Sequence, residues 1–162
     1  MAEQRHTISL LVDNQPGVLS RIAGMFSGRG FNIESLCVAE TVDPMVSRIT
    51  LVTSGDELVV ERINKQLNKL VNVIKVQDLT GTNFVERETA LIKVKAKPAQ
   101  KAEILRLVDI FKCKVVDVNT TSYIIEVTGT GEKLEALLKL LKPMGVKEIA
   151  RTGTSALARN KK

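Results

Sequence analysis

The residues best suited to ligand chemistry lie in one short stretch, Asp13–Ile22, which reads DNQPGVLSRI. An alternating apolar strand precedes this stretch and a helical pattern follows it, so a helix is expected to begin near Gly17. The first N–H groups of such a helix, here on Gly17–Leu19, have no partner within the helix and carry the positive end of its dipole. A carboxylate can therefore bind to them.

Two neighbouring residues strengthen this interpretation. Gly17 has no Cβ, so a ligand can come close to the backbone, and Asn14 offers both a donor and an acceptor at the rim. Together they favour a site for a small molecule with an anionic head, such as an amino acid. The same residues also fit an ordinary strand-to-helix turn in which Asn14 or Gln15 merely caps the helix.

Other candidates for chemistry are weak. His6 is the only histidine, so neither a histidine-based metal site nor a catalytic triad has its partners. The segment Thr128–Lys133 hints at a phosphate loop, but Glu132 separates Gly131 from the lysine and no Ser or Thr follows. The sequence therefore predicts no catalytic residue and no metal ligand in this chain.

Both halves of the sequence show the same order of helices and strands, and these elements must position the candidate site residues. Each half has the order strand, helix, strand, strand, helix, strand, judged from apolar residues at periods of two and of three to four. In the first half the elements are expected at His6–Val12, Gly17–Gly28, Ile33–Ala39, Val46–Thr53, Asp56–Lys69 and Val73–Leu79. In the second half they are expected at Thr89–Ala96, Pro98–Phe111, Lys114–Val118, Ser122–Thr128, Glu132–Leu141 and Val146–Arg151.

This order predicts an α+β protein of two ferredoxin-like βαββαβ domains. The expected division is a domain over residues 1–79, a linker over 80–84 and a second domain over 85–162. Right-handed crossovers put both helices on one face of each antiparallel sheet, which leaves the other face open. In the first domain that face should include Thr7, Ser9 and Leu11. Because each domain is small and keeps an uncovered face, we expect at least a homodimer.

Composition narrows the class of protein. The 162 residues are 44% hydrophobic and 26% charged, which is typical of a globular chain, and aromatic residues make up only 3%. The N-terminus has no apolar targeting segment, and no apolar stretch approaches the length of a membrane helix. Cys37 and Cys113 each lie in an apolar segment, which favours buried free thiols over a disulfide. A cytoplasmic location is expected.

The positive charge is concentrated in the second half. Residues 81–162 hold 16 lysines and arginines against nine acidic residues, whereas residues 1–80 hold eight against nine. A basic surface could bind nucleic acid or an acidic partner protein, or be an ordinary solvated face. Single-stranded nucleic-acid sites also use aromatic side chains, and this half offers only Phe84, Phe111 and Tyr123. We therefore expect no nucleic-acid partner.

The stretch Val12–Leu36 resembles the signature of the ACT domain, in the version found in the small regulatory subunits of acetolactate (acetohydroxyacid) synthase. The residues that carry the resemblance are Asn14, Pro16-Gly17-Val18-Leu19, Arg21, Phe26, Arg29-Gly30 and Asn32-Ile33-Glu34-Ser35-Leu36. The run Arg29–Leu36 is its most specific part. Further matches occur at Asp43-Pro44, Ser47-Arg48-Ile49-Thr50, Val85-Glu86-Arg87-Glu88 and Ile149-Ala150-Arg151-Thr152-Gly153, so the resemblance spans nearly the whole chain.

The resemblance implies a non-catalytic regulator. Such subunits bind a branched-chain amino acid, usually valine, between paired ACT domains, activate the large catalytic subunit and confer feedback inhibition on it. Thiamine diphosphate, FAD and magnesium then belong to that catalytic partner, and this chain needs no cofactor. The residues expected to line the site are Asn14, Gly17, Val18, Leu19, Asn32 and Ile33. The amide of Asn32 is expected to reach the ligand of a neighbouring copy.

Three alternatives remain open at this stage. A free-standing ACT-type amino-acid sensor would act on some other enzyme. A ferredoxin-like nucleic-acid binder would use the basic second half and would bind with a steep dependence on salt. A small enzyme on the same fold is disfavoured because no acid–base or nucleophile constellation is present.

Overall fold

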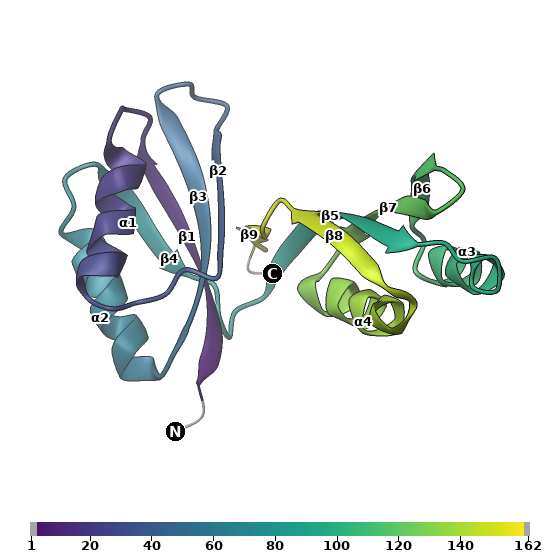
Figure 1. Ribbon diagram of the computed structural model, residues 1–162. Helices are drawn as coiled ribbons and strands as arrows, with labels where there is room; N and C mark the ends of the chain where they lie inside the picture. The colour runs from purple at the N-terminus through teal and green to yellow at the C-terminus, as the bar shows by residue number, and fades with distance from the viewer. Residues whose placement is uncertain (1–2, 161–162) are drawn as a thin grey trace. The chain divides into compact units, whose positions relative to one another are not determined.

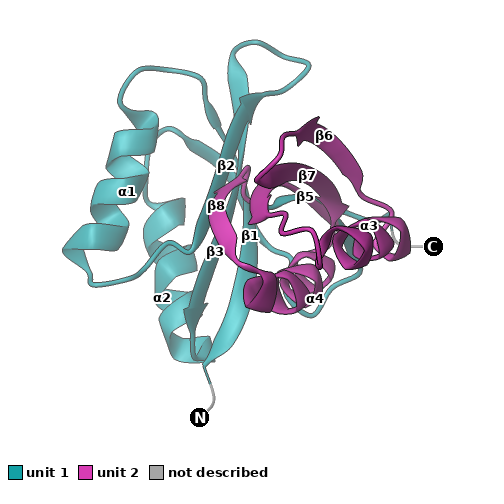
Figure 2. Cartoon of the chain, turned by 45° about the vertical axis from the view of Figure 1, so that its right-hand side comes forward, with its two compact units in different colours: residues 1–85, 154–162 teal, residues 86–153 magenta. Residues whose placement is uncertain are grey.

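A computed structural model describes residues 3–160 of the chain. The chain forms two compact units (Figure 2). The first contains the chain up to Val85 together with the segment that begins at Thr154, and the second is Glu86–Gly153. The change of unit after Val85 lies close to the expected linker. The C-terminal segment differs from the expected division, because it groups with the first unit rather than the second.

The first unit is a four-stranded antiparallel sheet with two helices on one face (Figure 1). Its strand order is β2-β3-β1-β4, so β2 and β4 are the edges. The elements are β1 (Gln4–Asp13), α1 (Val18–Gly28), β2 (Ser35–Glu40), β3 (Val46–Gly55), α2 (Glu57–Asn68) and β4 (Val73–Asp78). The α+β class and the βαββαβ order predicted from the sequence are confirmed for this half.

Alternation along β1 builds the core of the first unit. Ile8, Leu10 and Val12 are buried beneath the helices, where Ile22 and Phe26 of α1 also pack. Because successive strand residues point to opposite faces, the residues between them lie on the other face. The start of α2 is fixed locally by Asp56, whose Oδ1 accepts the Val59 N–H at 2.9 Å.

The second unit repeats the plan with strand order β6-β7-β5-β8. Its elements are β5 (Phe84–Lys95), α3 (Lys101–Ile110), β6 (Lys114–Val118), β7 (Ser122–Gly129), α4 (Gly131–Leu141), the short 3-10 helix η1 (Lys142–Met144) and β8 (Val146–Arg151). Apolar residues of β5 and of both helices form its own core. Tyr123 is buried in that core. It therefore offers no exposed ring for a nucleic-acid base to stack on.

The structure contains one further strand, β9, that the sequence did not predict. β9 (Ser155–Ala158) pairs with β5, and β5 itself begins at Phe84 instead of Thr89. The Thr154 N–H, just before β9, donates to Ser35 Oγ at 2.9 Å. The expectation of an open outer face on β1 was wrong for Thr7 and Ser9, which are both buried. In this unit β9 lies against β1.

Cys37 and Cys113 are free thiols, but both are only half-buried, so the expectation of full burial was wrong. Both cysteines lie at the periphery of their units, Cys37 on the edge strand β2 and Cys113 just before β6, the outermost strand of its sheet. Among residues 3–160, no helix is long and apolar enough to cross a membrane.

Candidate functional site

The loop between β1 and α1 is held by the side chain and backbone of Asn14. Asn14 Nδ2 donates to Pro44 O at 2.9 Å and to Glu40 Oε1 at 3.2 Å. Its backbone N–H donates to Met45 O at 2.8 Å. These bonds join the loop to the β2–β3 connection and occupy the amide nitrogen of Asn14. The Oδ1 atom is the polar atom that Asn14 can still offer to a ligand.

Gly17 is the N-cap of α1. The sequence had suggested instead that Gly17 is the first residue of the helix. Its φ of 86° lies in the left-handed region, which explains why glycine occupies this position. A Cβ placed on Gly17 would meet nothing within 4 Å, so the space beside it is open. Among the described residues no side chain caps α1, and its first turn holds no acidic residue. By contrast, Asp56 caps α2 and Thr130 caps α4.

The side chains of the two residues that follow Gly17 differ in their exposure. Val18 is buried in the core of the unit, so its side chain supports the helix from beneath. Leu19 is 41% exposed and supplies apolar surface at the start of the helix. An uncapped helix start, an amide oxygen and an exposed aliphatic side chain together suit the carboxylate, the ammonium group and the side chain of an aliphatic amino acid.

Asn32 and Ile33 lie at the other end of the same sheet. They belong to the loop before β2, because the strand begins at Ser35 and not at Ile33 as expected. The Asn32 carbonyl accepts a hydrogen bond from Thr53 Oγ1 at 2.6 Å. Asp13 pairs with Val46 on the same strand, β3. Val46 and Thr53 are seven positions apart on this extended strand, which is roughly 23 Å.

One copy of the chain therefore does not bring the six expected site residues together. Asn14, Gly17 and Leu19 gather at one end of the sheet, and Asn32 and Ile33 lie at the other end. A single ligand that touches both groups needs them from two copies of the chain.

The sequence did not predict a polar network that lies beside the group of Asn14, Gly17 and Leu19 and stabilises it. Arg21 Nη1 donates to Asn72 Oδ1 at 2.7 Å, and Asn72 Nδ2 donates to Asp13 Oδ2 at 3.1 Å. The Asp13 N–H also donates to Asn72 O at 2.9 Å. Asn72 lies 59 positions from Asp13, and nothing in the local pattern around it signals this contact. The network ties α1 and the end of β1 to the turn before β4.

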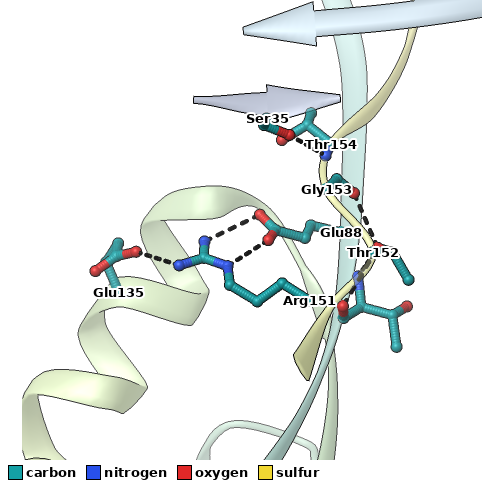
Figure 3. Close-up of polar contacts among 8 residues, drawn as sticks. Ser35, Glu88, Glu135, Arg151, Thr152, Gly153 and Thr154 are labelled. Atoms are coloured by element: carbon teal, nitrogen blue, oxygen red, sulfur yellow. Dashed lines mark hydrogen bonds and ion pairs between the residues drawn. The ribbon is translucent and has the colours of Figure 1, made fainter. Parts of the chain in front are cut away.

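The second unit carries an ion pair whose carboxylate is buried (Figure 3). Arg151 Nε and Nη2 donate to Glu88 Oε1 and Oε2 at 2.5 and 3.2 Å, and Arg151 Nη1 donates to Glu135 Oε1 at 2.9 Å. The Glu88 side chain is only 3% exposed. Hydrogen bonding to Glu88 raises the pKa of Arg151 above its usual range. The arrangement is structural, because both carboxylates are already paired.

Comparison with known proteins covers both units. A family profile described as "AHAS small subunit-like ACT domain" matches residues 8–75, and one described as "Small subunit of acetolactate synthase" matches residues 87–160. A protein of Archaeoglobus fulgidus named as a probable acetolactate synthase small subunit is 51% identical over 158 residues, which are 98% of this chain and 99% of that protein. The chain belongs to the acetolactate synthase small-subunit family.

Other members of the family agree along the whole length. The acetolactate synthase small subunit of Mycolicibacterium smegmatis is 51% identical over 95% of this chain and 91% of its own. The crystal structure of the small subunit from Thermotoga maritima superposes with a TM-score of 0.87 at 45% identity, and covers 98% of this chain and 99% of that one. The resemblance inferred from the sequence is therefore confirmed for both halves of this small-subunit family member. The first unit is its ACT domain.

Proposed function

We propose that this chain is the regulatory subunit of an acetolactate synthase. It binds a branched-chain amino acid, valine or else leucine or isoleucine, between two copies of its ACT domain. In the complex it activates the large catalytic subunit and makes that subunit sensitive to feedback inhibition. The observation that carries the proposal is the similarity to small subunits of this enzyme over nearly the full length of both chains.

The helix start of α1 supports an amino-acid ligand. Its N–H groups have no acidic residue in the first turn to compete for them, and the open space beside Gly17 lets a carboxylate approach. Asn14 Oδ1 can accept a hydrogen bond from the ligand's ammonium group. Leu19 provides apolar contact for an aliphatic side chain.

The geometry of the edge strand β2 supports a site shared by two copies. β2 has six residues, about 20 Å, and Glu40 at its end is bonded to Asn14 while Asn32 lies just before its start. If two copies pair antiparallel along β2, the start of one strand lies beside the end of the other. Asn32 and Ile33 of the second copy then lie next to Asn14 and Gly17 of the first, which completes the site.

This arrangement predicts that Val38→Lys weakens self-association. Val38 is 41% exposed near the middle of β2, so the two-fold pairing would set the two new lysines close together. Like charges that face each other across paired strands are destabilising. We expect the dimer dissociation constant, measured by sedimentation equilibrium, to rise at least about tenfold, which is ~1.4 kcal/mol.

The matched control for this prediction is Ile74→Lys on β4, the opposite edge of the same sheet, where the aliphatic side chain is 55% exposed. It should leave the dissociation constant unchanged. The β2 arrangement is refuted if Ile74→Lys dissociates the dimer and Val38→Lys does not.

The proposal also places catalysis outside this chain. Among residues 3–160, no group of three or more His, Cys, Asp or Glu side chains is arranged to hold a metal ion. We propose that thiamine diphosphate, FAD and magnesium are held by the catalytic partner. That partner supplies the chemistry, and this chain alters its activity through contact.

The isolated chain is accordingly expected to form no acetolactate from pyruvate, even with thiamine diphosphate, FAD and magnesium present. The measurement is a colorimetric acetolactate assay on the purified chain, the catalytic subunit and the two together. Addition of the chain should raise the rate of the catalytic subunit, and valine should lower the rate only of the mixture. Turnover by the chain alone, free of catalytic subunit, would contradict the proposal.

The ligand is tested directly by isothermal titration of the purified chain with valine, leucine and isoleucine. Saturable binding of at least one of them, with half a ligand or one ligand per chain, supports the proposal. If none binds and the chain still activates the catalytic subunit, the regulatory role stands and the amino-acid site is rejected. If the chain binds an amino acid but does not associate with the catalytic subunit, it is a free-standing sensor.

A further inference from the structure

We propose that the first unit contains a second binding site, for a small molecule with a protonated primary amine. It is a depression of about 390 Å³ bordered by His6, Asn64 and Asp78. It lies at the end of β1 opposite to Asn14, between the first turns of α2 and the end of β4. The inference is independent of the amino-acid site described above, since the two share no residue.

A buried histidine without hydrogen bonds forms one wall of this depression. His6 continues the inward-facing row of Ile8 and Leu10 along β1 and is only 5% exposed. Within residues 3–160, neither of its ring nitrogens has a hydrogen-bond partner. Nδ1 lies 3.4 Å from Asp78 Oδ2 without forming a hydrogen bond. Burial of a polar group with no partner costs stability, so such a group in a native protein calls for a partner.

A third unpaired polar atom belongs to another residue that borders the same depression. Asn64 lies on α2, and its Oδ1 is buried and has no hydrogen-bond partner within the described part of the chain. Two buried polar groups from different elements thus border one hollow. Four such atoms are found among the described residues, and three of them are in His6 and Asn64. This concentration distinguishes the depression from the other hollows of the surface.

The available atoms all suit a hydrogen-bond donor with positive charge. Asp78 Oδ1 accepts the Thr80 N–H at 2.9 Å, whereas Oδ2, which lies 3.4 Å from His6 Nδ1, accepts no hydrogen bond among the described residues. An imidazole nitrogen that carries no proton can accept a hydrogen bond, and Asn64 Oδ1 is an acceptor. These three acceptors match the three N–H donors of a primary ammonium group.

The rim adds further negative charge. Glu57 and Glu61 of α2 border the depression, although Glu61 is already paired with Lys65, whose Nζ lies 2.6 Å from Glu61 Oε1. These carboxylates disfavour the binding of an anion. Among the described residues, no group of three or more His, Cys, Asp or Glu side chains is arranged to hold a metal ion. A volume of about 390 Å³ is near the lower end for ligand sites, which favours a small aliphatic amine over a larger ligand.

The test uses the single histidine of the full-length chain as a reporter. Because His6 is the only histidine, its imidazole ring gives one set of carbon-bound proton signals in NMR spectra. We expect titration with 1,4-diaminobutane at constant pH and ionic strength to shift these signals in a saturable way. Tetramethylammonium chloride carries the same kind of charge but no N–H donor, and should not produce this shift.

Two variants locate the site. Asp78→Asn keeps an oxygen for the Thr80 N–H and removes the charge, and Asn64→Ala removes the unpaired oxygen. Each should weaken 1,4-diaminobutane binding at least about tenfold. Glu132→Gln, at the start of α4 in the other unit, is the matched control and should bind like the wild type. Thermal melting checks that each variant is folded, and if one of the two is not, the other decides.

The proposal is overturned by any of three results. The first is the absence of a saturable shift with 1,4-diaminobutane. The second is an equal response to tetramethylammonium, which would show a general effect of cations. The third is unchanged affinity in the folded site variants, which would place the amine elsewhere.

Discussion

Replacement of Gly17 by aspartate is expected to abolish amino-acid binding while the chain remains folded. The new carboxylate would lie where the ligand's own carboxylate is proposed to bind, would repel it and would compete for the N–H groups at the start of α1, which no side chain caps. In the reconstituted enzyme, Gly17→Asp should still activate the catalytic subunit, and valine should no longer inhibit it. Isothermal titration with valine and the acetolactate assay measure the two effects.

The backbone at Gly17 sets the cost of this substitution. A left-handed φ of 86° costs a residue with a side chain about 1–2 kcal/mol, although aspartate and asparagine tolerate this region better than most. The added Cβ meets no neighbour within 4 Å. A negative charge at a helix start returns about 0.3–1 kcal/mol. We therefore expect a loss of stability of about 1 kcal/mol or less, visible as a small decrease in melting temperature.

Gly17→Asn is the matched control, because asparagine has the same shape and the same backbone cost without the charge. It should weaken valine binding less than Gly17→Asp does. If both variants lose binding equally, occupancy of the helix start and not repulsion explains the loss. If Gly17→Asp binds valine as well as the wild type does, the ligand is not at this helix start. If Gly17→Asp and Gly17→Asn both unfold, glycine is required at this position for the turn between β1 and α1.

Replacement of Arg151 by methionine is expected to have the largest effect on stability. Glu88 is held by two hydrogen bonds from Arg151, and its side chain is 3% exposed. Removal of the arginine leaves a buried carboxylate without its counter-charge, which costs about 3–5 kcal/mol in a fully buried pair and less here, because the Arg151 side chain is 32% exposed. Such a loss is a large part of the stability of a small domain.

The single tyrosine gives a selective measurement of this loss. The chain has no tryptophan, and Tyr123 lies in the core of the second unit, so its fluorescence in urea reports the unfolding of that unit. Lys93→Met is the matched control on the adjacent strand β5. It breaks the pair with Glu148, which is 71% exposed, and should cost less than about 1 kcal/mol.

A double variant separates charge burial from simple loss of contacts. Glu88→Leu combined with Arg151→Met removes both partners, and replacement of a whole buried pair by apolar residues is often neutral. We expect the double variant to recover most of the stability that Arg151→Met loses. If it is as unstable as Arg151→Met alone, then packing of the arginine, and not its charge, stabilises the unit.

Much of the fold could be predicted because its signals are local. Alternation over Ile8, Leu10 and Val12 predicted β1, and spacing of three to four residues predicted the helices, since these periods follow from the geometry of each element. The order of elements then restricted the sheet topology. Helix starts were also predictable where a side chain caps, as at Asp56, since that bond joins residues three apart.

The family was also determined by the sequence alone. The run Arg29–Leu36, together with the stretch around Pro16 and Gly17, carries the resemblance to the small-subunit family without any tertiary contact. These residues did not show where a site would be complete. The structure places Asn32 and Ile33 at the far end of the sheet from Asn14, a separation that depends on how β2 and β3 pair.

The tertiary structure alone decided the contacts between segments that are far apart in the chain. β9 has no strong pattern of its own and becomes a strand because it pairs with β5. Glu88 and Arg151 are 63 positions apart, and each reads as an ordinary charged residue until β5 and β8 lie side by side. The physical reason is that local backbone preferences act over a few residues, whereas burial and ion pairing depend on which surfaces meet when the chain folds.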